Sequence, residues 1–241
     1  MHLSLPDRGL NKGDIYTQFT ELTANDAKWK QGRTFSLVFY PGEEVSEVLF
    51  HAYKSFFFEN GLNPSVFRSL KQMENEVVSM TLGLLHAPDS AVGNMTSGGT
   101  ESILCAVKAA KKYWRDKKPR VTHPNIVMPQ TAHPAFYKAA DYFDLEVRAV
   151  PCIGEGVVPD MAKYESLVDE NTAIIVGSAP AYPHGTIDPL EEINKLAAAK
   201  DVWFHVDACV GGYMIPFLEQ IGEPVPVFDF RLSNATSISL D

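Results

Sequence analysis

The sequence Thr-Ser-Gly-Gly-Thr-Glu at residues 96–101 opens a helical pattern and could bind an anion. Adjacent glycines let backbone N–H groups approach a ligand closely. The unpaired N–H groups and positive dipole end at the start of a helix then favour a phosphate. The same residues also suit an ordinary N-cap, provided by Ser97 or Thr100. The segment is neither a P-loop, which ends in Gly-Lys-Ser/Thr, nor a dinucleotide-binding Gly-x-Gly-x-x-Gly pattern.

A carboxylate follows a hydrophobic run at residues 205–209, His-Val-Asp-Ala-Cys. Asp207 stands where a strand should end, and parallel sheets bind ligands at the carboxyl ends of their strands. A buried carboxylate is costly unless a cation pairs with it, and a protonated pyridine nitrogen would be such a cation. The pair would keep that nitrogen protonated. An Asp that caps the next helix is the other interpretation.

Two further segments follow expected strands. In residues 131–136, Thr-Ala-His-Pro-Ala-Phe, the flat ring of His133 could stack on a flat cofactor, or the residue could simply cap a helix. Residues 178–189 form a Pro- and Gly-rich loop in which we expect Asp188 to cap the next helix, with Pro189 at the first helical position. Ser178 or His184 of this loop could lie near the site.

The elements that position these residues alternate between strand and helix. The first forty residues read as an irregular arm, and residues 45–58 and 66–85 each show a helical apolar face. Beyond residue 93 the pattern predicts helices at 101–114, 135–143, 160–168 and 188–199, with strands at 126–128, 145–150, 173–176 and 202–206. We therefore expect an α/β domain over residues 61–241, with a mainly parallel sheet and helices on both faces, preceded by a helical N-terminal arm over residues 1–60.

Composition excludes several classes of protein. The 241 residues are 45% hydrophobic and 21% charged, as in an ordinary globular protein, and the net charge of −9 disfavours nucleic acid as a partner. Three cysteines without pairing or metal-ligand spacing predict a reducing compartment and no metal site. Because no signal peptide or transmembrane stretch is evident, we expect a cytoplasmic protein. Residues 237–241 read as an unfinished strand, so we expect the chain to be truncated, cleaved or partial.

Together these segments resemble the pyridoxal-phosphate (PLP) dependent decarboxylases and lyases of fold type I, and specifically the sphingosine-1-phosphate lyase family. The strings Thr-Ser-Gly-Gly-Thr-Glu-Ser-Ile at 96–103 and His-Val-Asp-Ala-Cys-Val-Gly-Gly at 205–212 are the most specific. The other matching segments are residues 63–67, 74–78, 132–136, 182–185 and 228–231. The resemblance covers nearly the whole chain and implies the large domain of the fold type I enzymes.

The resemblance implies PLP as cofactor and a homodimer with shared active sites. Among its implied site residues, His133 stacks over the pyridine ring and Asp207 pairs with the ring nitrogen, so these two are the predicted catalytic residues. The predicted cofactor-binding set is Ser97, Gly98, Gly99, Thr100, His133, Asp207 and Cys209. The segment 36–40 would supply Tyr40 to the site of the neighbouring subunit.

The chain departs from the family pattern in two places. The family's Schiff-base lysine would lie shortly beyond Asp241, and none of the lysines present has a matching context. Sphingoid-phosphate lyases commonly read Asn-Pro-Leu-His-Pro-Asp where residues 61–66 read Gly-Leu-Asn-Pro-Ser-Val, so the histidine of that stretch is missing here. This second departure concerns the substrate.

For a complete protein the resemblance implies cleavage of a phosphorylated long-chain base to a fatty aldehyde and phosphoethanolamine, with the cofactor ring as the electron sink. Its partner would be a small phosphorylated amine substrate. One alternative is a PLP-dependent decarboxylase of glutamate or tyrosine. Another is a non-catalytic, degenerate relative, if the native chain ends at Asp241. A dinucleotide-dependent oxidoreductase would require the glycine fingerprint that this chain lacks.

Overall fold

The structure is a computed structural model that describes residues 4–32, 34, 38–119 and 122–241. The chain divides into two compact units, Met1–Asn60 and Gly61–Asp241. Within the described ranges, no helix is both long and apolar enough to cross a bilayer.

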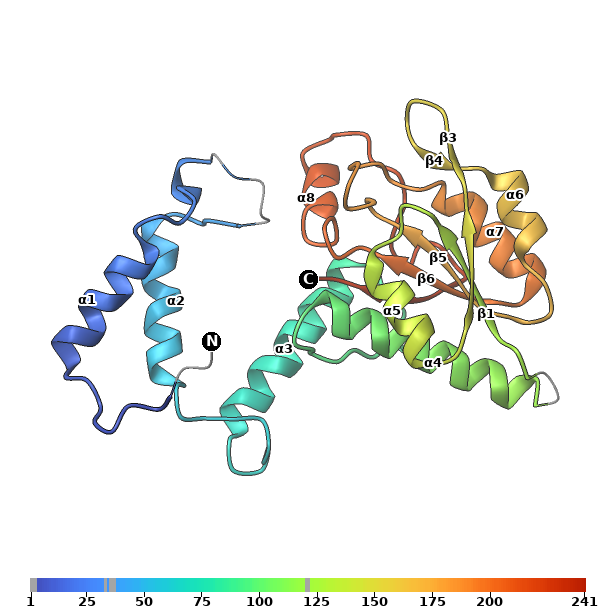
Figure 1. Cartoon of the computed structure of the whole chain (residues 1–241). Helices are drawn as coiled ribbons and strands as arrows, with labels where there is room; N and C mark the ends of the chain where they lie inside the picture. Colours follow the sequence, from blue (N-terminus) through green and yellow to red (C-terminus); the bar gives the residue numbers. More distant parts are fainter. Residues whose placement is uncertain (1–3, 33, 35–37, 120–121) are drawn as a thin grey trace. The chain divides into compact units, whose positions relative to one another are not determined.

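The first unit contains two helices, α1 (Lys12–Thr23) and α2 (Glu43–Ser55), and a short 3₁₀ turn at Trp29–Gln31 (Figure 1). The prediction of an irregular arm over the first forty residues was therefore wrong. Asn11 caps α1 by accepting a hydrogen bond from the Asp14 N–H at 3.0 Å. The apolar side chains Ile15, Phe19 and Leu22 recur at helical spacing, so the sequence carried a signal for α1 although the helix buries no residue.

The second unit is built on a five-stranded sheet in the order β2-β1-β5-β6-β7, in which every pairing is parallel. This confirms the predicted mainly parallel α/β fold. The predicted strands all form, with boundaries that differ by a few residues. Their bounds are β1 (Asn125–Pro129), β2 (Glu146–Val150), β5 (Thr172–Ser178), β6 (Trp203–Asp207) and β7 (Ala235–Ser239).

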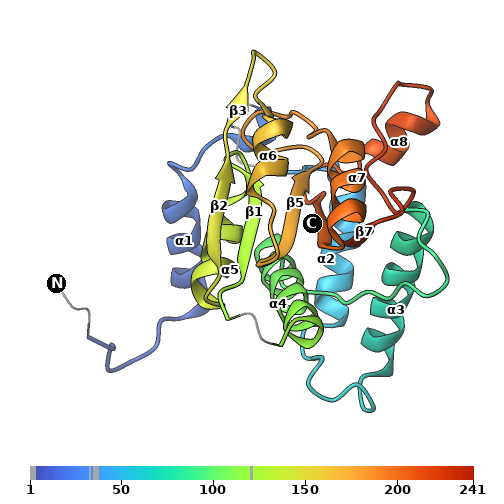
Figure 2. The ribbon, with the colours of Figure 1, turned by 90° about the vertical axis from the view of Figure 1, so that its right-hand side faces the viewer.

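Helices cover both faces of this sheet (Figure 2). Side chains alternate between faces along each strand, so Ile126 and Met128 pack with α4 (Gly99–Lys117) and α5 (Pro134–Tyr142). Val127, between them, packs in the opposite core with α6 (Met161–Leu167) and α7 (Leu190–Lys200). The two cores fix the sheet from both sides, so the carboxyl ends of its strands form a rigid edge.

Several elements lie outside this sandwich. The helix α3 (Arg68–Leu84) forms where the sequence predicts a helix, but it buries none of its residues. The short helix α8 (Ile215–Gln220) and the two-stranded hairpin of β3 (Cys152–Ile153) and β4 (Val158–Pro159) were not predicted. Each of these is too short to show a clear period.

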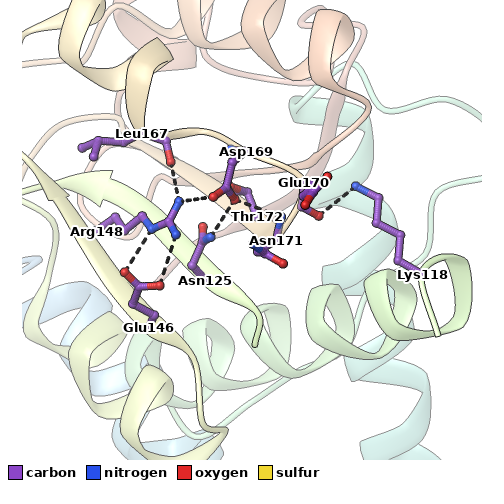
Figure 3. Close-up of polar contacts among 9 residues, drawn as sticks. All are labelled: Lys118, Asn125, Glu146, Arg148, Leu167, Asp169, Glu170, Asn171 and Thr172. Carbon is purple, nitrogen blue, oxygen red and sulfur yellow. Dashed lines mark hydrogen bonds and ion pairs between the residues drawn. The ribbon is translucent and has the colours of Figure 1, made fainter. Parts of the chain in front are cut away.

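At the amino ends of the strands, a polar network ties β2 and β1 to the loop before β5 (Figure 3). The Arg148 guanidinium donates to Asp169 Oδ2 at 2.7 Å and to Glu146, and the Asn125 amide donates to Asp169 Oδ1 at 3.0 Å. Burial opposes ionisation of Asp169, but the hydrogen bonds from Arg148 and Asn125 lower the pKa of its carboxyl group below the ordinary value. We call Arg148, Asp169 and Asn125 the amino-edge network.

Candidate functional site

The start of α4 carries the predicted anion site. Its N-cap is Gly98, at φ 142°, and no described side chain caps the helix, so the alternative interpretation of an ordinary N-cap at Ser97 or Thr100 is not supported. Instead the Ser97 N–H donates to Glu101 Oε2 at 2.6 Å. The backbone N–H groups of the first turn therefore remain available for an anionic ligand, as the sequence pattern predicts.

A side chain at position 99 would crowd its neighbours. A Cβ at this position would lie 2.9 Å from Cys209 Sγ and 3.1 Å from Asp241 Oδ2, both closer than a normal contact. Cys209 follows β6 and Asp241 follows β7, so the start of α4 rests directly on the carboxyl ends of these two strands. This contact brings two of the predicted motifs, residues 96–101 and 205–209, into one place.

Asp207 is the last residue of β6 and is 6% exposed. Its Oδ1 accepts hydrogen bonds from the Cys209 N–H at 3.2 Å and from the Ser239 hydroxyl at 3.4 Å. It does not cap the next helix, because α8 begins only at Ile215 and its N-cap is Met214. Across residues 4–32, 34, 38–119 and 122–241, the structure gives Asp207 no ion pair and gives its Oδ2 no hydrogen bond. A mostly buried carboxylate with one open oxygen suits a ligand that carries a positive charge.

His133 is the N-cap of α5 and is half-buried. Its Nδ1 accepts a hydrogen bond from the Ala135 N–H at 3.2 Å, so in the neutral ring the proton must be on Nε2. The Tyr182 ring lies edge-on to the His133 ring, with 5.8 Å between the centroids. Capping fixes the orientation of the imidazole at the ligand-binding edge. Tyr182 is a neighbour that the sequence analysis had not singled out, although it lies in one of the matching segments.

Asp188 and Ser178 lie beside Asp207, because Ser178 pairs with Asp207 in the register of β5 and β6. Asp188 does not cap α7, whose N-cap is Pro189; its Oδ2 accepts from the Ser178 N–H at 2.7 Å instead. Burial, reinforced by the charge of Asp207, raises the pKa of Asp188 to about 6. His184, by contrast, is exposed in the loop between β5 and α7.

Two surface hollows lie away from these residues. One, of about 540 Å³, runs along α4 beside Phe143, and the other, of about 360 Å³, runs along α3 between Arg68 and Ser79. Neither is lined by His133, Asp207 or Gly99. Nor do the described parts of the chain contain a cluster of three metal-binding side chains.

The arrangement can therefore bind an anionic group and a cationic group of one ligand at neighbouring points. The start of α4 provides N–H groups for the anion, and Asp207 provides a carboxylate for the cation. Cys209 connects the two by packing against Gly99. His133 lies at the start of the helix that follows β1, and among the described residues no hydrogen bond or ring contact joins it to Asp207 or Gly99.

Comparisons with known proteins agree with this geometry. Residues 42–241 match the pyridoxal-dependent decarboxylase conserved domain. The whole chain is 41% identical to a sphingosine-1-phosphate lyase of Oryza sativa, of which it covers 46%. Its fold matches the solved sphingosine-1-phosphate lyase of Burkholderia pseudomallei with a TM-score of 0.93 at 37% identity, covering all of this chain and 57% of the other. A probable L-tyrosine/L-aspartate decarboxylase of Methanothermobacter thermautotrophicus is 37% identical over 77% of this chain, which covers 49% of that protein. The chain thus spans less than half the length of these curated relatives.

Proposed function

Because this chain belongs to the pyridoxal-dependent decarboxylase family, we propose that it forms the cofactor-binding part of a PLP-dependent carbon–carbon lyase. The substrate would be a phosphorylated long-chain base similar to sphingosine-1-phosphate, and the products a fatty aldehyde and phosphoethanolamine. Identity of 37–41% to seven sphingosine-1-phosphate lyases, over 98% or more of this chain, supports a lyase over a decarboxylase.

One structural observation carries the cofactor assignment: Asp207 is a buried carboxylate with an open Oδ2, next to an uncapped helix start. The phosphate of PLP would bind at the uncapped helix start, and its ring nitrogen would pair with Asp207. Ser97, Gly98, Gly99 and Thr100 would hold the phosphate. His133 would lie on the face of the ring, and Cys209 would pack against Gly99.

Bound PLP supplies an electron sink for the carbanion that forms when a carbon–carbon bond breaks. Asp207 contributes by holding a proton on the ring nitrogen, because an adjacent carboxylate favours the charged form of that nitrogen. His133 contributes an imidazole ring whose orientation is fixed by the hydrogen bond from the Ala135 N–H. We assign no Schiff-base lysine within residues 1–241.

The active protein would be a homodimer with shared sites. The helix α2 buries no residue, and its apolar side chains Val48, Leu49 and Tyr53 are 57–69% exposed. In the second unit α3 also buries none, with Met80 66% exposed. Two such faces on a single chain are typical of surfaces that a second subunit covers. Light scattering on the full-length protein should give twice the mass of one chain; a monomer would contradict this part.

Tyr40 would approach the partner's site from the first unit. The structure describes Tyr40, whose hydroxyl bonds Glu43 and whose ring contacts Trp29, but residues 36 and 37 of the same segment lie outside the described residues. The supporting argument for this role is the resemblance alone.

The reaction is tested by identifying the products. The full-length protein, supplied with PLP, should release a long-chain aldehyde and phosphoethanolamine from dihydrosphingosine-1-phosphate. It should release no carbon dioxide from glutamate or tyrosine. Release of carbon dioxide without aldehyde would replace the lyase proposal with a decarboxylase. Failure to bind PLP would overturn both.

A further inference from the structure

Four polar side chains lie on one face of the last two strands. Because side chains two residues apart on a strand share a face, His205 and Asp207 of β6 point to the same side, as do Ser237 and Ser239 of β7. The parallel register places His205 opposite Ser237 and Asp207 opposite Ser239. His205, Asp207 and Ser239 are 1%, 6% and 4% exposed, so the face is almost closed to solvent.

These side chains form a continuous chain of hydrogen bonds. The Trp203 Nε1–H donates to Ser237 Oγ at 2.8 Å, and Ser237 Oγ lies 2.8 Å from His205 Nδ1. On the other side of the ring, His205 Nε2 lies 3.2 Å from Ser239 Oγ, which in turn donates to Asp207 Oδ1 at 3.4 Å. We call Trp203, Ser237, His205, Ser239 and Asp207 the β6–β7 relay.

Only one arrangement of protons satisfies every bond of the relay. A carboxylate can only accept, so Ser239 must donate its single hydrogen to Asp207 and must accept from His205. Nε2 of His205 therefore carries a proton. The ring is neutral, since burial lowers the pKa of His205 to about 4, and its Nδ1 must accept from Ser237. Ser237 then accepts from Trp203. Every donor points toward Asp207.

We propose that the β6–β7 relay is a positioning device: it holds Oδ1 of Asp207 so that Oδ2 faces the cationic ring nitrogen of the cofactor. The assignment rests on the proposed function for the identity of that cation. His205 and Ser239 act through Asp207 and are positioning residues. Cys209 assists, since its backbone N–H donates to the same Oδ1 and its thiol donates to Ser239 at 3.4 Å.

The opposite face of the same strand shows why the relay is more than packing. Phe204 and Val206 alternate with His205 and are completely buried in an apolar core. Apolar residues would fill the relay face without the desolvation cost of an imidazole and a hydroxyl. The polar residues instead supply an oriented donor to the one carboxylate at the strand end. A side chain at position 205 without donors would remove the bond that orients Ser239 from the strand β6.

The test uses the full-length protein and the variant Ser239→Ala, which removes the last donor before Asp207. We expect the dissociation constant for PLP, measured by fluorescence quenching of the apoprotein, to rise about tenfold, as for the loss of one hydrogen bond to a charged group. The separate variant Ser239→Thr keeps the hydroxyl and should retain most of the wild-type affinity for PLP. Thr236→Ala removes an exposed hydroxyl from the opposite face of the same strand and should leave affinity unchanged. Thermal unfolding of each variant establishes that it is folded.

A second readout does not depend on the cofactor. In ¹⁵N-histidine-labelled apoprotein, the His205 ring should show a protonated Nε2 and an unprotonated Nδ1 at neutral pH, with the signal identified by its loss in His205→Asn. A protonated Nδ1 would overturn the relay. Unchanged PLP affinity in a folded Ser239→Ala variant would overturn its positioning role. If the wild type binds no PLP but shows the expected tautomer, the proposed function fails and the relay's proton arrangement stands.

Discussion

The sheet carries a hydrogen-bonded carboxylate at each edge, the exposed Asp169 at the amino ends of the strands and the buried Asp207 at the carboxyl ends. The two differ in how completely their oxygens are hydrogen-bonded. At the amino edge, Asp169 has both oxygens bonded, one by the Arg148 guanidinium and the other by Asn125 and the Asn171 N–H. At the carboxyl edge, Asp207 has donors on Oδ1 only and has no cationic partner among the described residues. The fold thus contains its own cation for one carboxylate and leaves the other for a ligand.

This difference separates a stabilising role from a binding role. A carboxylate that is paired and fully hydrogen-bonded contributes to folding, and removing its partners is costly. A carboxylate without a cation costs free energy until a ligand supplies one. Asp169 and Asp207 therefore form a matched pair: we expect removal of Asp169 to change stability and removal of Asp207 to change function.

The largest expected effect comes from Asp207→Ala in the full-length protein. Losing a buried ion pair costs about 3 kcal/mol, so we expect aldehyde formation to fall roughly 100-fold, while the phosphate site retains part of the PLP. Product assays and bound PLP after dialysis measure the two quantities. Near-normal turnover would remove Asp207 from the ring-pairing role.

The pH dependence of stability should separate two buried groups with opposite signs. His205 has a folded pKa of about 4 against an ordinary 6.5, so it contributes stability that is present above pH 6.5 and lost as the pH falls toward 4. Asp188 has a folded pKa of about 6 against 3.8, so its contribution is present at low pH and lost as the pH rises through 6. Each amounts to roughly 3 kcal/mol.

The two contributions partly cancel in the wild type, and variants should reveal them. From pH 4 to 6.5, relative to wild type, Asp188→Asn should gain stability with rising pH, and His205→Asn should lose it. Urea unfolding of the full-length protein at several pH values provides the comparison. Parallel pH curves for the two variants would show that the burial of these groups has been misassigned.

A moderate effect is expected at the amino edge. Asp169→Ala leaves the buried Asn125 amide without its acceptor, while Arg148 keeps its bonds to Glu146 and the Leu167 carbonyl, so we expect a loss of about 2 kcal/mol in the free energy of unfolding. PLP affinity should be unchanged. As a control, Asp116→Ala breaks the exposed Lys112–Asp116 pair and should change stability by less than about 0.5 kcal/mol. Weakened PLP binding in Asp169→Ala would contradict the division between the two edges.

The smallest effect is expected for Ser178→Ala. The Ser178 hydroxyl is buried beside Asp188, and the structure gives it no hydrogen-bond partner among the described residues. Removing an unpaired hydroxyl loses no bond, so stability should change by no more than about 0.5 kcal/mol. A clear destabilisation, measured by thermal unfolding, would indicate a hydrogen bond from Ser178 to Asp207 or Asp188.

The sequence predicts the sheet well because its strands are short, continuous apolar runs between amphipathic helices. Runs such as Ile174–Val176, in β5, are completely buried, and a buried run needs no knowledge of its partners to be recognised. The helix α1 was missed although Ile15, Phe19 and Leu22 recur at helical spacing, because it lies in a segment whose Gly, Pro and polar residues read as irregular. The helix cap at Asp188 was also mispredicted, because Pro189 takes that position while Asp188 accepts from the Ser178 N–H.

The candidate site is only partly readable from sequence. Gly98, Gly99 and Asp207 belong to compact local motifs, so their positions at a helix start and at a strand end could be predicted. Ser239 could not, because its contact with Asp207 depends on the register between strands 32 residues apart in sequence. The polar alternation at positions 205, 207, 237 and 239 was the available signal, and only the strand order shows that these residues meet.

The central claim is that Asp207 keeps the ring nitrogen of PLP protonated. The most direct measurement is the ¹⁵N chemical shift of that nitrogen in full-length protein reconstituted with ¹⁵N-labelled PLP, followed as the pH is raised. We predict a protonated nitrogen throughout the stable pH range in the wild type, and loss of that proton at lower pH in Asp207→Ala. An unprotonated ring nitrogen in the wild type at neutral pH would contradict the account.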